Sequence, residues 1–123
     1  MQIKNTPGRV LAIRKIEIVG HGDAAVGQVT IKLYSPQPMD QGKGWLCYDE
    51  ILGIGDEEPR YGAGSDPIQA ILLTLTNIGA YVYASDEAKA GQLRWAGDEN
   101  LGFPVFFPEV ITAPPDSILK LFV

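Results

Sequence analysis

The pattern of apolar and polar positions predicts one main helix, over about residues 66–84. Apolar side chains recur there at spacings of three and four, as in a helix with one buried stripe. Asp66 can cap the first turn, Pro67 suits the first helical position, and Gln69 can complete a capping box. The stripe expected to face the core consists of Ile68, Ile71, Leu75, Ile78 and Val82, flanked by Leu72 and Gly79. The opposite, polar side is expected to carry Gln69, Thr74, Thr76, Asn77 and Tyr81.

Two stretches before this helix have the composition of strands. Residues 9–19 are rich in Val and Ile, but their alternation changes phase, which indicates a bulge or a strand covered partly on both faces. A glycine-containing loop at residues 20–23 separates them from residues 28–34, where the alternation is clean. The side chains expected to face the core from the second stretch are Val29, Ile31 and Leu33.

A third strand is predicted at residues 45–52. Its odd-numbered and its even-numbered residues each combine apolar side chains with an acidic one, so neither face is clearly the buried one. We favour the parity that carries Leu46, Tyr48 and Leu52 as the inner side. A glycine-rich acidic loop follows at residues 53–64, with room for a short strand near Arg60.

The chain after the helix is expected to return over the core. Residues 92–96 can form a short strand, and Pro104 and Pro108 make residues 103–112 an extended cover or edge strand. The apolar stretch 117–123 should also dock on the domain. Strands followed by one helix and further strands predict an α+β domain, with an antiparallel meander sheet of about four to five strands and the helix packed across one face.

Composition indicates a single globular domain, residues 1–123, with 46% hydrophobic and 20% charged residues. No stretch approaches the about 20 apolar residues that a membrane span needs. The first residues lack the apolar run of a signal peptide. Cys47 is the only cysteine, so no disulfide can form within the chain. We therefore expect a cytoplasmic protein with no membrane partner.

The net charge of −5 argues against nucleic acid as a partner, because phosphate contacts need clustered Lys and Arg. Residues 40–66 hold seven acids and two bases, so they carry the whole excess. This segment is a solvated loop, a docking surface for a basic partner, or a metal site. Leu73 breaks the pattern of the helix, either as an isolated exposed leucine or as part of a partner surface. The candidate partner-binding residues are Asp49, Glu50, Asp56, Glu57, Glu58 and Leu73.

The sequence offers no set of residues for catalysis, cofactor binding or metal binding. One His and one Cys cannot build a closed zinc site. The glycine pairs 53/55 and 62/64 precede the helix but lack the Lys-Ser/Thr of a phosphate-binding loop, and the nearby acids would repel phosphate. We therefore predict no catalytic residue, no cofactor and no metal, and a non-enzymatic role is favoured over an enzyme.

Two functions from different classes stay open. Negative charge focused on a compact domain without catalytic residues favours a protein-interaction domain, such as an immunity-type inhibitor or adaptor that docks a basic partner. The alternative is a small-molecule binder or enzyme with an aromatic pocket, in which Tyr48 or Arg94 supplies polar contacts. Its aromatic lining would be Trp95, Phe103, Phe106 and Phe107. A homodimer through an edge strand, at residues 9–19 or 45–52, or through the Leu73 face is also expected.

Several short segments between Trp45 and Pro104 are informative as a set. They are Trp45-Leu46-Cys47-Tyr48, Arg60-Tyr61 before Gly64, Asp66-Pro67-Ile68-Gln69-Ala70, Leu93-x-Trp95 and Gly102-Phe103-Pro104. Together they resemble a family of small bacterial proteins known only as a domain of unknown function. Pro67 and Ile71 depart from the family's pattern, which has a small polar residue and Leu there, and both changes suit a helix. The resemblance implies relatives but no activity.

Overall fold

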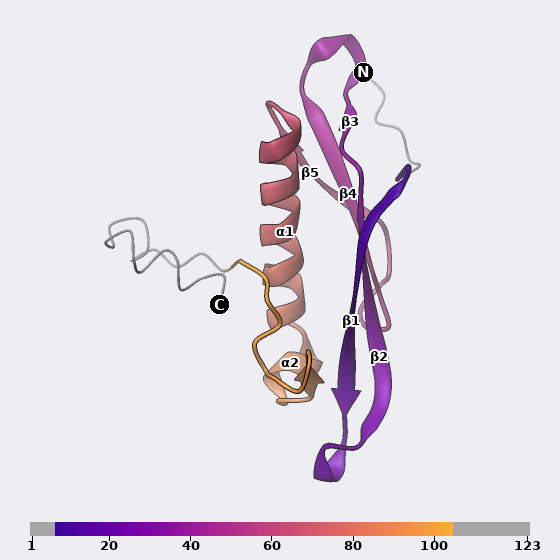
Figure 1. Cartoon of the computed structure of the whole chain (residues 1–123), viewed down its shortest axis with the longest axis vertical. Helices are drawn as coiled ribbons and strands as arrows, with labels where there is room; N and C mark the ends of the chain where they lie inside the picture. The colour runs from indigo at the N-terminus through magenta and orange to yellow at the C-terminus, as the bar shows by residue number, and fades with distance from the viewer. Residues whose placement is uncertain (1–6, 105–123) are drawn as a thin grey trace, which may run out of the picture.

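The computed structural model describes residues 7–104 of the 123-residue chain. These residues form an α+β fold in which one main helix lies along one face of an open antiparallel sheet (Figure 1). The strand order is β3-β4-β2-β1-β6, and β5 pairs with β4 outside this path. The predicted fold class is therefore confirmed, with six strands in the sheet.

The elements follow the predicted order closely. The strands are β1 (Val10–Val19), β2 (Ala25–Tyr34), β3 (Gln37–Pro38), β4 (Trp45–Leu52), β5 (Arg60–Gly64) and β6 (Leu93–Arg94). The helices are α1 (Pro67–Tyr83) and the short α2 (Asp86–Lys89), with two 3₁₀ turns at His21–Asp23 and Asp40–Gly42. No helix within residues 7–104 is long and apolar enough to cross a membrane.

The long β1–β2 hairpin forms the centre of the sheet. Ile16 pairs with Val29, and both side chains are fully buried. The register shifts near Leu11 and again between Ile18 and Val19, which confirms the irregularity expected from the change of phase. The clean alternation of β2 is also confirmed, because its odd-numbered apolar residues join the main core.

The inner side of β4 is the opposite of the one predicted. Ile51 belongs to the main core beneath α1, so the odd-numbered parity faces the helix. Leu46 and Tyr48 are buried too, but they pack with Tyr34 in a second cluster on the other face of the sheet. Both faces of β4 are thus covered, which explains why its sequence shows no clear alternation.

Helix α1 begins where its start signals predicted. The Asp66 carboxylate accepts a hydrogen bond of 2.8 Å from the Gln69 N–H, and Pro67 occupies the first helical position. The Gln69 side chain accepts a 2.6 Å bond from the Ser65 N–H instead of the Asp66 N–H. Free N–H groups around the helix start are therefore satisfied by local side chains.

The face that α1 turns to the sheet matches the predicted stripe only in part, because Ile78, Gly79 and Val82 are buried as expected but Ile68 and Leu72 are not. The buried residues are Ala70, Thr74, Ile78, Gly79 and Val82. Ile68, which we expected in the core, is 68% exposed, and Leu72 is exposed as well. The helix is apolar around much of its circumference, so hydrophobic spacing alone did not identify the contact face.

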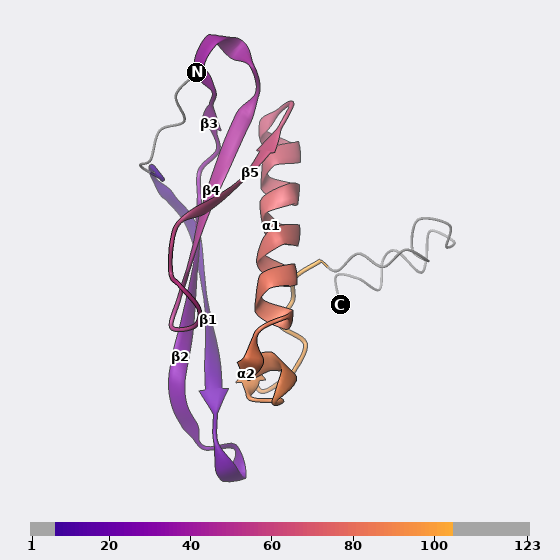
Figure 2. The same cartoon turned by 180° about the vertical axis from the view of Figure 1, so that it is seen from behind.

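Small residues decide which face of α1 meets the sheet. A Cβ on Gly62 would lie 2.5 Å from the Thr74 hydroxyl oxygen, and a Cβ on Gly64 would lie 2.5 Å from the Ala70 nitrogen. Only glycine permits this approach of β5 to the helix backbone. Figure 2 shows β5 passing from the sheet to the side of α1.

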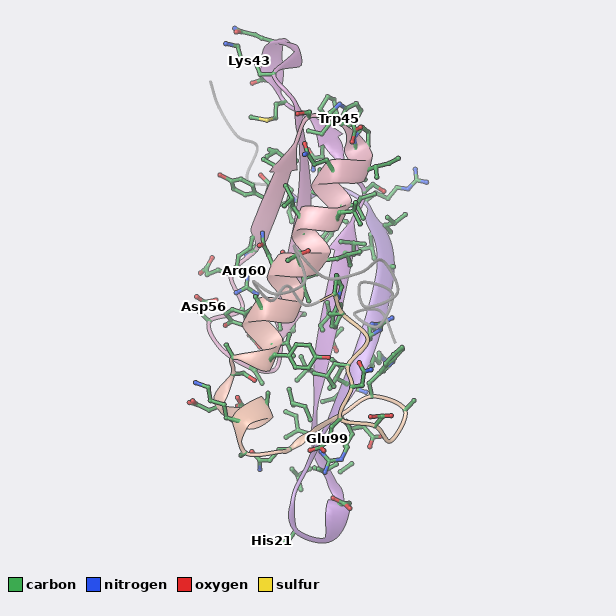
Figure 3. The ribbon with its side chains drawn as sticks, turned by 90° about the vertical axis from the view of Figure 1, so that its left-hand side faces the viewer. His21, Lys43, Trp45, Asp56, Arg60 and Glu99 are labelled. Carbon is green, nitrogen blue, oxygen red and sulfur yellow. The ribbon has the colours of Figure 1, made fainter. Side chains whose placement is uncertain are left out.

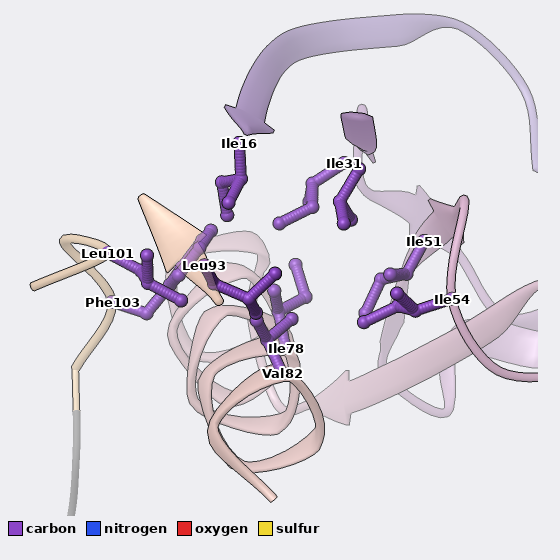
Figure 4. Close-up of a cluster of buried hydrophobic side chains, with 10 residues drawn as sticks. Ile16, Ile31, Ile51, Ile54, Ile78, Val82, Leu93, Leu101 and Phe103 are labelled. Atoms are coloured by element: carbon purple, nitrogen blue, oxygen red, sulfur yellow. The ribbon is translucent and has the colours of Figure 1, made fainter. Parts of the chain in front are cut away.

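The main core lies between α1 and the β1–β2–β4 part of the sheet (Figure 4). Leu101 and Phe103, from the chain after α2, close it from one side. Gly79 allows this segment to cross the helix, because a Cβ there would lie 2.8 Å from the Pro104 carbonyl oxygen. The expected cover is therefore present as far as Pro104, and the predictions for residues 105–112 and 117–123 lie outside the described residues.

Candidate functional site

The acidic residues between Asp40 and Asp66 do not form one surface. Asp66 caps α1, and Asp40 lies in a 3₁₀ turn next to Lys43, at the end of the molecule remote from Asp56 (Figure 3). Glu50 lies on the face of the sheet turned away from α1, where its carboxylate accepts a hydrogen bond from the Tyr34 hydroxyl. Burial and this hydrogen bond raise the pKa of Tyr34 to about 12. Charge that is contiguous in the sequence is thus dispersed in space.

Asp49 is 1% exposed, so it does not belong to any partner surface. Its carboxylate oxygen lies 3.7 Å from an Arg60 guanidinium nitrogen, an ion pair too long to be a hydrogen bond. Burial raises the pKa of Asp49 to about 6, and the nearby Arg60 opposes that rise. The pair follows from the register, because Asp49 stands opposite Arg60 in the β4–β5 hairpin.

Three of the predicted acids, Asp56, Glu57 and Glu58, do gather, in the exposed loop between β4 and β5. Glu57 accepts a 2.7 Å hydrogen bond from the Gly53 N–H, and Asp56 accepts a 3.1 Å bond from the Glu58 N–H. The loop is therefore ordered by two of its own carboxylates. The Glu58 side chain makes no hydrogen bond or ion pair within residues 7–104.

An open cleft of about 360 Å³ lies beside this loop, between β5 and α1. The Arg60 guanidinium stacks 3.6 Å above the centre of the Tyr81 ring. Tyr61 is 44% exposed and packs edge-on against Tyr48, with the ring centres 5.6 Å apart. The cleft is lined by Pro59, Arg60, Tyr61, Asn77 and Tyr81.

Leu73 lies on the same side of the molecule as the acidic loop. It precedes Asn77 and Tyr81 by one and two helical turns, so the three residues form one stripe along α1. Leu73 is 42% exposed. We call the cleft, Leu73 and the loop residues 56–58 the α1–β5 surface.

The predicted aromatic pocket is occupied by a side chain that the sequence did not single out. Arg14 stacks between two rings, 3.8 Å from the centre of Trp95 and 4.9 Å from the centre of Phe103. It donates hydrogen bonds of 3.0 Å to the Leu101 carbonyl and 3.2 Å to the Gly102 carbonyl. Burial lowers the pKa of Arg14. The available sequence signal was an Arg on the same strand parity as the core residue Ile16.

A groove of about 230 Å³ adjoins Arg14 and Phe103, between β1, β2 and α1. Neither polar residue proposed for the aromatic pocket reaches it. Tyr48 lies in the cluster on the other face of the sheet, and Arg94 pairs with Asp23 and Glu99. The predicted lining residues Phe106 and Phe107 lie outside the described residues.

The remaining candidates for chemistry stand apart from both sites. His21 lies in the exposed turn between β1 and β2. Cys47 is fully buried, and burial raises the pKa of its thiol. Within residues 7–104, no group of three or more His, Cys, Asp and Glu side chains is arranged to hold a metal ion.

Comparison with known protein families gives a match over most of the described residues. The family model described as Domain of unknown function (DUF6968) matches residues 12–105. The match confirms the resemblance noted between Trp45 and Pro104 and extends it across the first two strands. No curated protein and no solved structure matches the chain.

Proposed function

The chain belongs to the domain family of unknown function DUF6968, and since that family brings no activity with it, we propose a role from the surface of the protein itself. The role is that of a non-enzymatic interaction domain that binds a protein partner through the α1–β5 surface. The observation that carries this proposal is an open cleft whose lining residues Asn77 and Pro59 adjoin exposed Leu73, one helical turn away, and the ordered acidic loop. The domain would act either as an immunity-type inhibitor of its partner or as an adaptor.

The chemistry of the surface defines the partner that it fits. Tyr81 and Leu73 offer an apolar and aromatic centre, the kind of composition that dominates binding energy in protein interfaces. Asp56, Glu57 and Glu58 place negative charge at its rim, while the charge of Arg60 is offset by Asp49. A partner with an apolar anchor bordered by Lys and Arg would associate quickly and bind less tightly in salt.

Site-specific photo-crosslinking in native lysate tests the proposal. A photoreactive residue at Leu73 is expected to yield one discrete protein adduct that disappears at about 0.5 M salt, where screening is strong. Val26, another exposed apolar residue, is the matched position for the control. Adducts equally abundant from both positions, or none from Leu73, would contradict the proposal.

A pair of charge reversals then tests the acidic loop with the purified partner. Glu58→Lys should slow association about tenfold, since steering depends on charge near the contact. Asp40→Lys makes the same change in the same segment of the sequence but at the far end of the molecule (Figure 3). It should leave the association rate within about twofold. Equal effects would mean that only net charge matters.

A second function, binding of a small molecule, is favoured by a separate observation. The groove beside Phe103 is the concave apolar site that this alternative requires. For either function, we propose that the protein is bacterial and located in the cytoplasm.

A further inference from the structure

The groove beside Phe103 has room for a small ligand. Its volume of about 230 Å³ exceeds the roughly 150 Å³ of an engineered apolar cavity that binds benzene. Three elements and the returning chain contribute apolar walls, so a hydrocarbon group would be surrounded on several sides. These walls include Ala12 on β1, Leu33 on β2, Leu75 on α1, and Phe103 and Pro104.

One charged side chain interrupts the apolar wall. Among the described residues that line the groove, Arg14 is the only one with a charge. Arg60 and Arg94 each lie within 4.0 Å of a carboxylate, whereas no carboxylate within residues 7–104 pairs with Arg14. Among residues 7–104, Arg14 is thus a partly buried cation without a counter-ion, in a position where a ligand could supply one.

The guanidinium is also held in a fixed orientation. The rings of Trp95 and Phe103 both pack against it, and its Nη1 nitrogen donates to the carbonyl oxygens of Leu101 and Gly102. The Nε and Nη2 donors have no partner within the described residues. A guanidinium presents its donors as a planar fork that matches the two oxygens of a carboxylate.

We propose that this groove binds a short apolar carboxylate, with the hydrocarbon part against Leu33 and Leu75 and the carboxylate on Arg14. The inference rests on the second function proposed above and names its ligand class. A cationic ligand would be repelled by Arg14, and a neutral one would leave the arginine without a counter-ion. The acid and the apolar chain are both required.

Binding of three probes of one length to the full chain tests the proposal. Octanoate, 1-octanol and octylamine are titrated while the methyl NMR signals of Ile13, Leu33 and Leu75 are followed. Octanoate should shift these signals saturably and bind about tenfold or more tightly than 1-octanol, because a hydrogen bond to a charged group is the stronger kind. Octylamine should bind weakest.

The outcomes separate the ligand class from the function. Equal affinity for octanoate and 1-octanol would overturn the carboxylate inference and leave a small-molecule groove. No saturable shift with any probe would overturn both, including the case in which residues 105–123 or a second copy already fills the groove.

Two pairs of variants locate the site. Ala12→Phe fills the groove and should abolish octanoate binding, whereas Ala63→Phe, on the exposed side of β5, should not. Arg14→Gln should remove the preference for octanoate over 1-octanol, and Arg14→Lys should retain part of it. A preference unchanged in a folded Arg14→Gln protein would contradict the role given to this arginine.

Discussion

Thr74 shows how one hydroxyl group can join three elements. It donates a 2.8 Å hydrogen bond to the Cys47 carbonyl in β4 and accepts a 3.0 Å bond from the Gly62 N–H in β5. We expected this residue on the polar side of the helix, because its spacing placed it opposite the predicted apolar stripe. Its position depends on partners distant in sequence, which a local pattern does not contain.

Replacement of Thr74 should therefore be costly despite preserving its shape. Thr74→Val removes both bonds and leaves a buried N–H without its acceptor, so the free energy of unfolding should fall by about 1–3 kcal/mol. Thr76→Val is the control on the same helix, since within the described part of the chain the Thr76 hydroxyl bonds only to the Leu72 carbonyl. Its cost should stay within about 0.5 kcal/mol in urea unfolding. Equal losses of unfolding free energy in the two variants would contradict the role of Thr74 in joining α1, β4 and β5.

Asp49 should give the protein a distinctive dependence on pH. Its pKa rises from 3.8 to about 6 on folding, so between these values the folded state holds more protons than the unfolded state. Stability contributed by Asp49 is therefore present at low pH and is lost as the pH rises through about 6. The loss should be on the order of 2 kcal/mol.

Urea unfolding of wild type and Asp49→Asn from about pH 4 to pH 7 measures this effect, since Asn does not titrate. The stability of the wild type relative to the variant should decline as the pH rises. A difference independent of pH, or one that grows with pH, would show that Arg60 outweighs burial at this site.

At the scale of elements, the ends of α1 were easier to predict than its orientation. Caps are local chemistry, so Asp66 and Pro67 marked the start correctly. Orientation depends on the approach of β5, and the sequence signal was a pairing of small residues. Gly62 and Gly64 on the strand match Ala70 and Thr74 on the helix. Likewise, β4 could not be oriented from parity because both of its faces are buried.

Two isoleucines on α1 distinguish the observed face from the predicted one. Ile78 is 1% exposed and lies in the main core, whereas Ile68 is largely exposed. Ile78→Ala should cost about 2–5 kcal/mol of unfolding free energy, through lost burial and the cavity left behind. Ile68→Ala, the matched control, should cost less than about 1 kcal/mol. Similar costs would support the original stripe.

At the scale of the whole molecule, the sheet has few free edges for association. Strand β4, one of the two edges considered from sequence, lies between β2 and β5. Strand β1 carries β6 at Glu17 and Ile18 and has a register shift near Leu11, and such irregularities hinder pairing with another chain. If the protein self-associates, the Leu73 face is the more suitable route.

Without the proposed partner bound, we expect a homodimer in which Leu73 contacts its own copy across a two-fold axis. Of the small residues Ala70 and Ala80 on the same helix, Ala80 is exposed, whereas Ala70 is buried beneath β5. Light scattering at micromolar concentration should show a dimer that Leu73→Glu converts to a monomer. Leu72→Glu, on a neighbouring exposed position, should remain dimeric. A dimer that survives Leu73→Glu would instead assign the contact to the edge of β1.

The returning chain after α2 has a consequence for how the protein is made. Arg14 bonds to carbonyl groups 87 and 88 residues further along, and Leu101 and Phe103 complete the core. A ribosome delivers the chain from its first residue onward, so the hairpin emerges long before the segment that covers it. During synthesis the apolar side of β1 and β2 is therefore not fully covered until Phe103 has left the exit tunnel. Completion of this core is thus timed by a segment that is translated late in the chain.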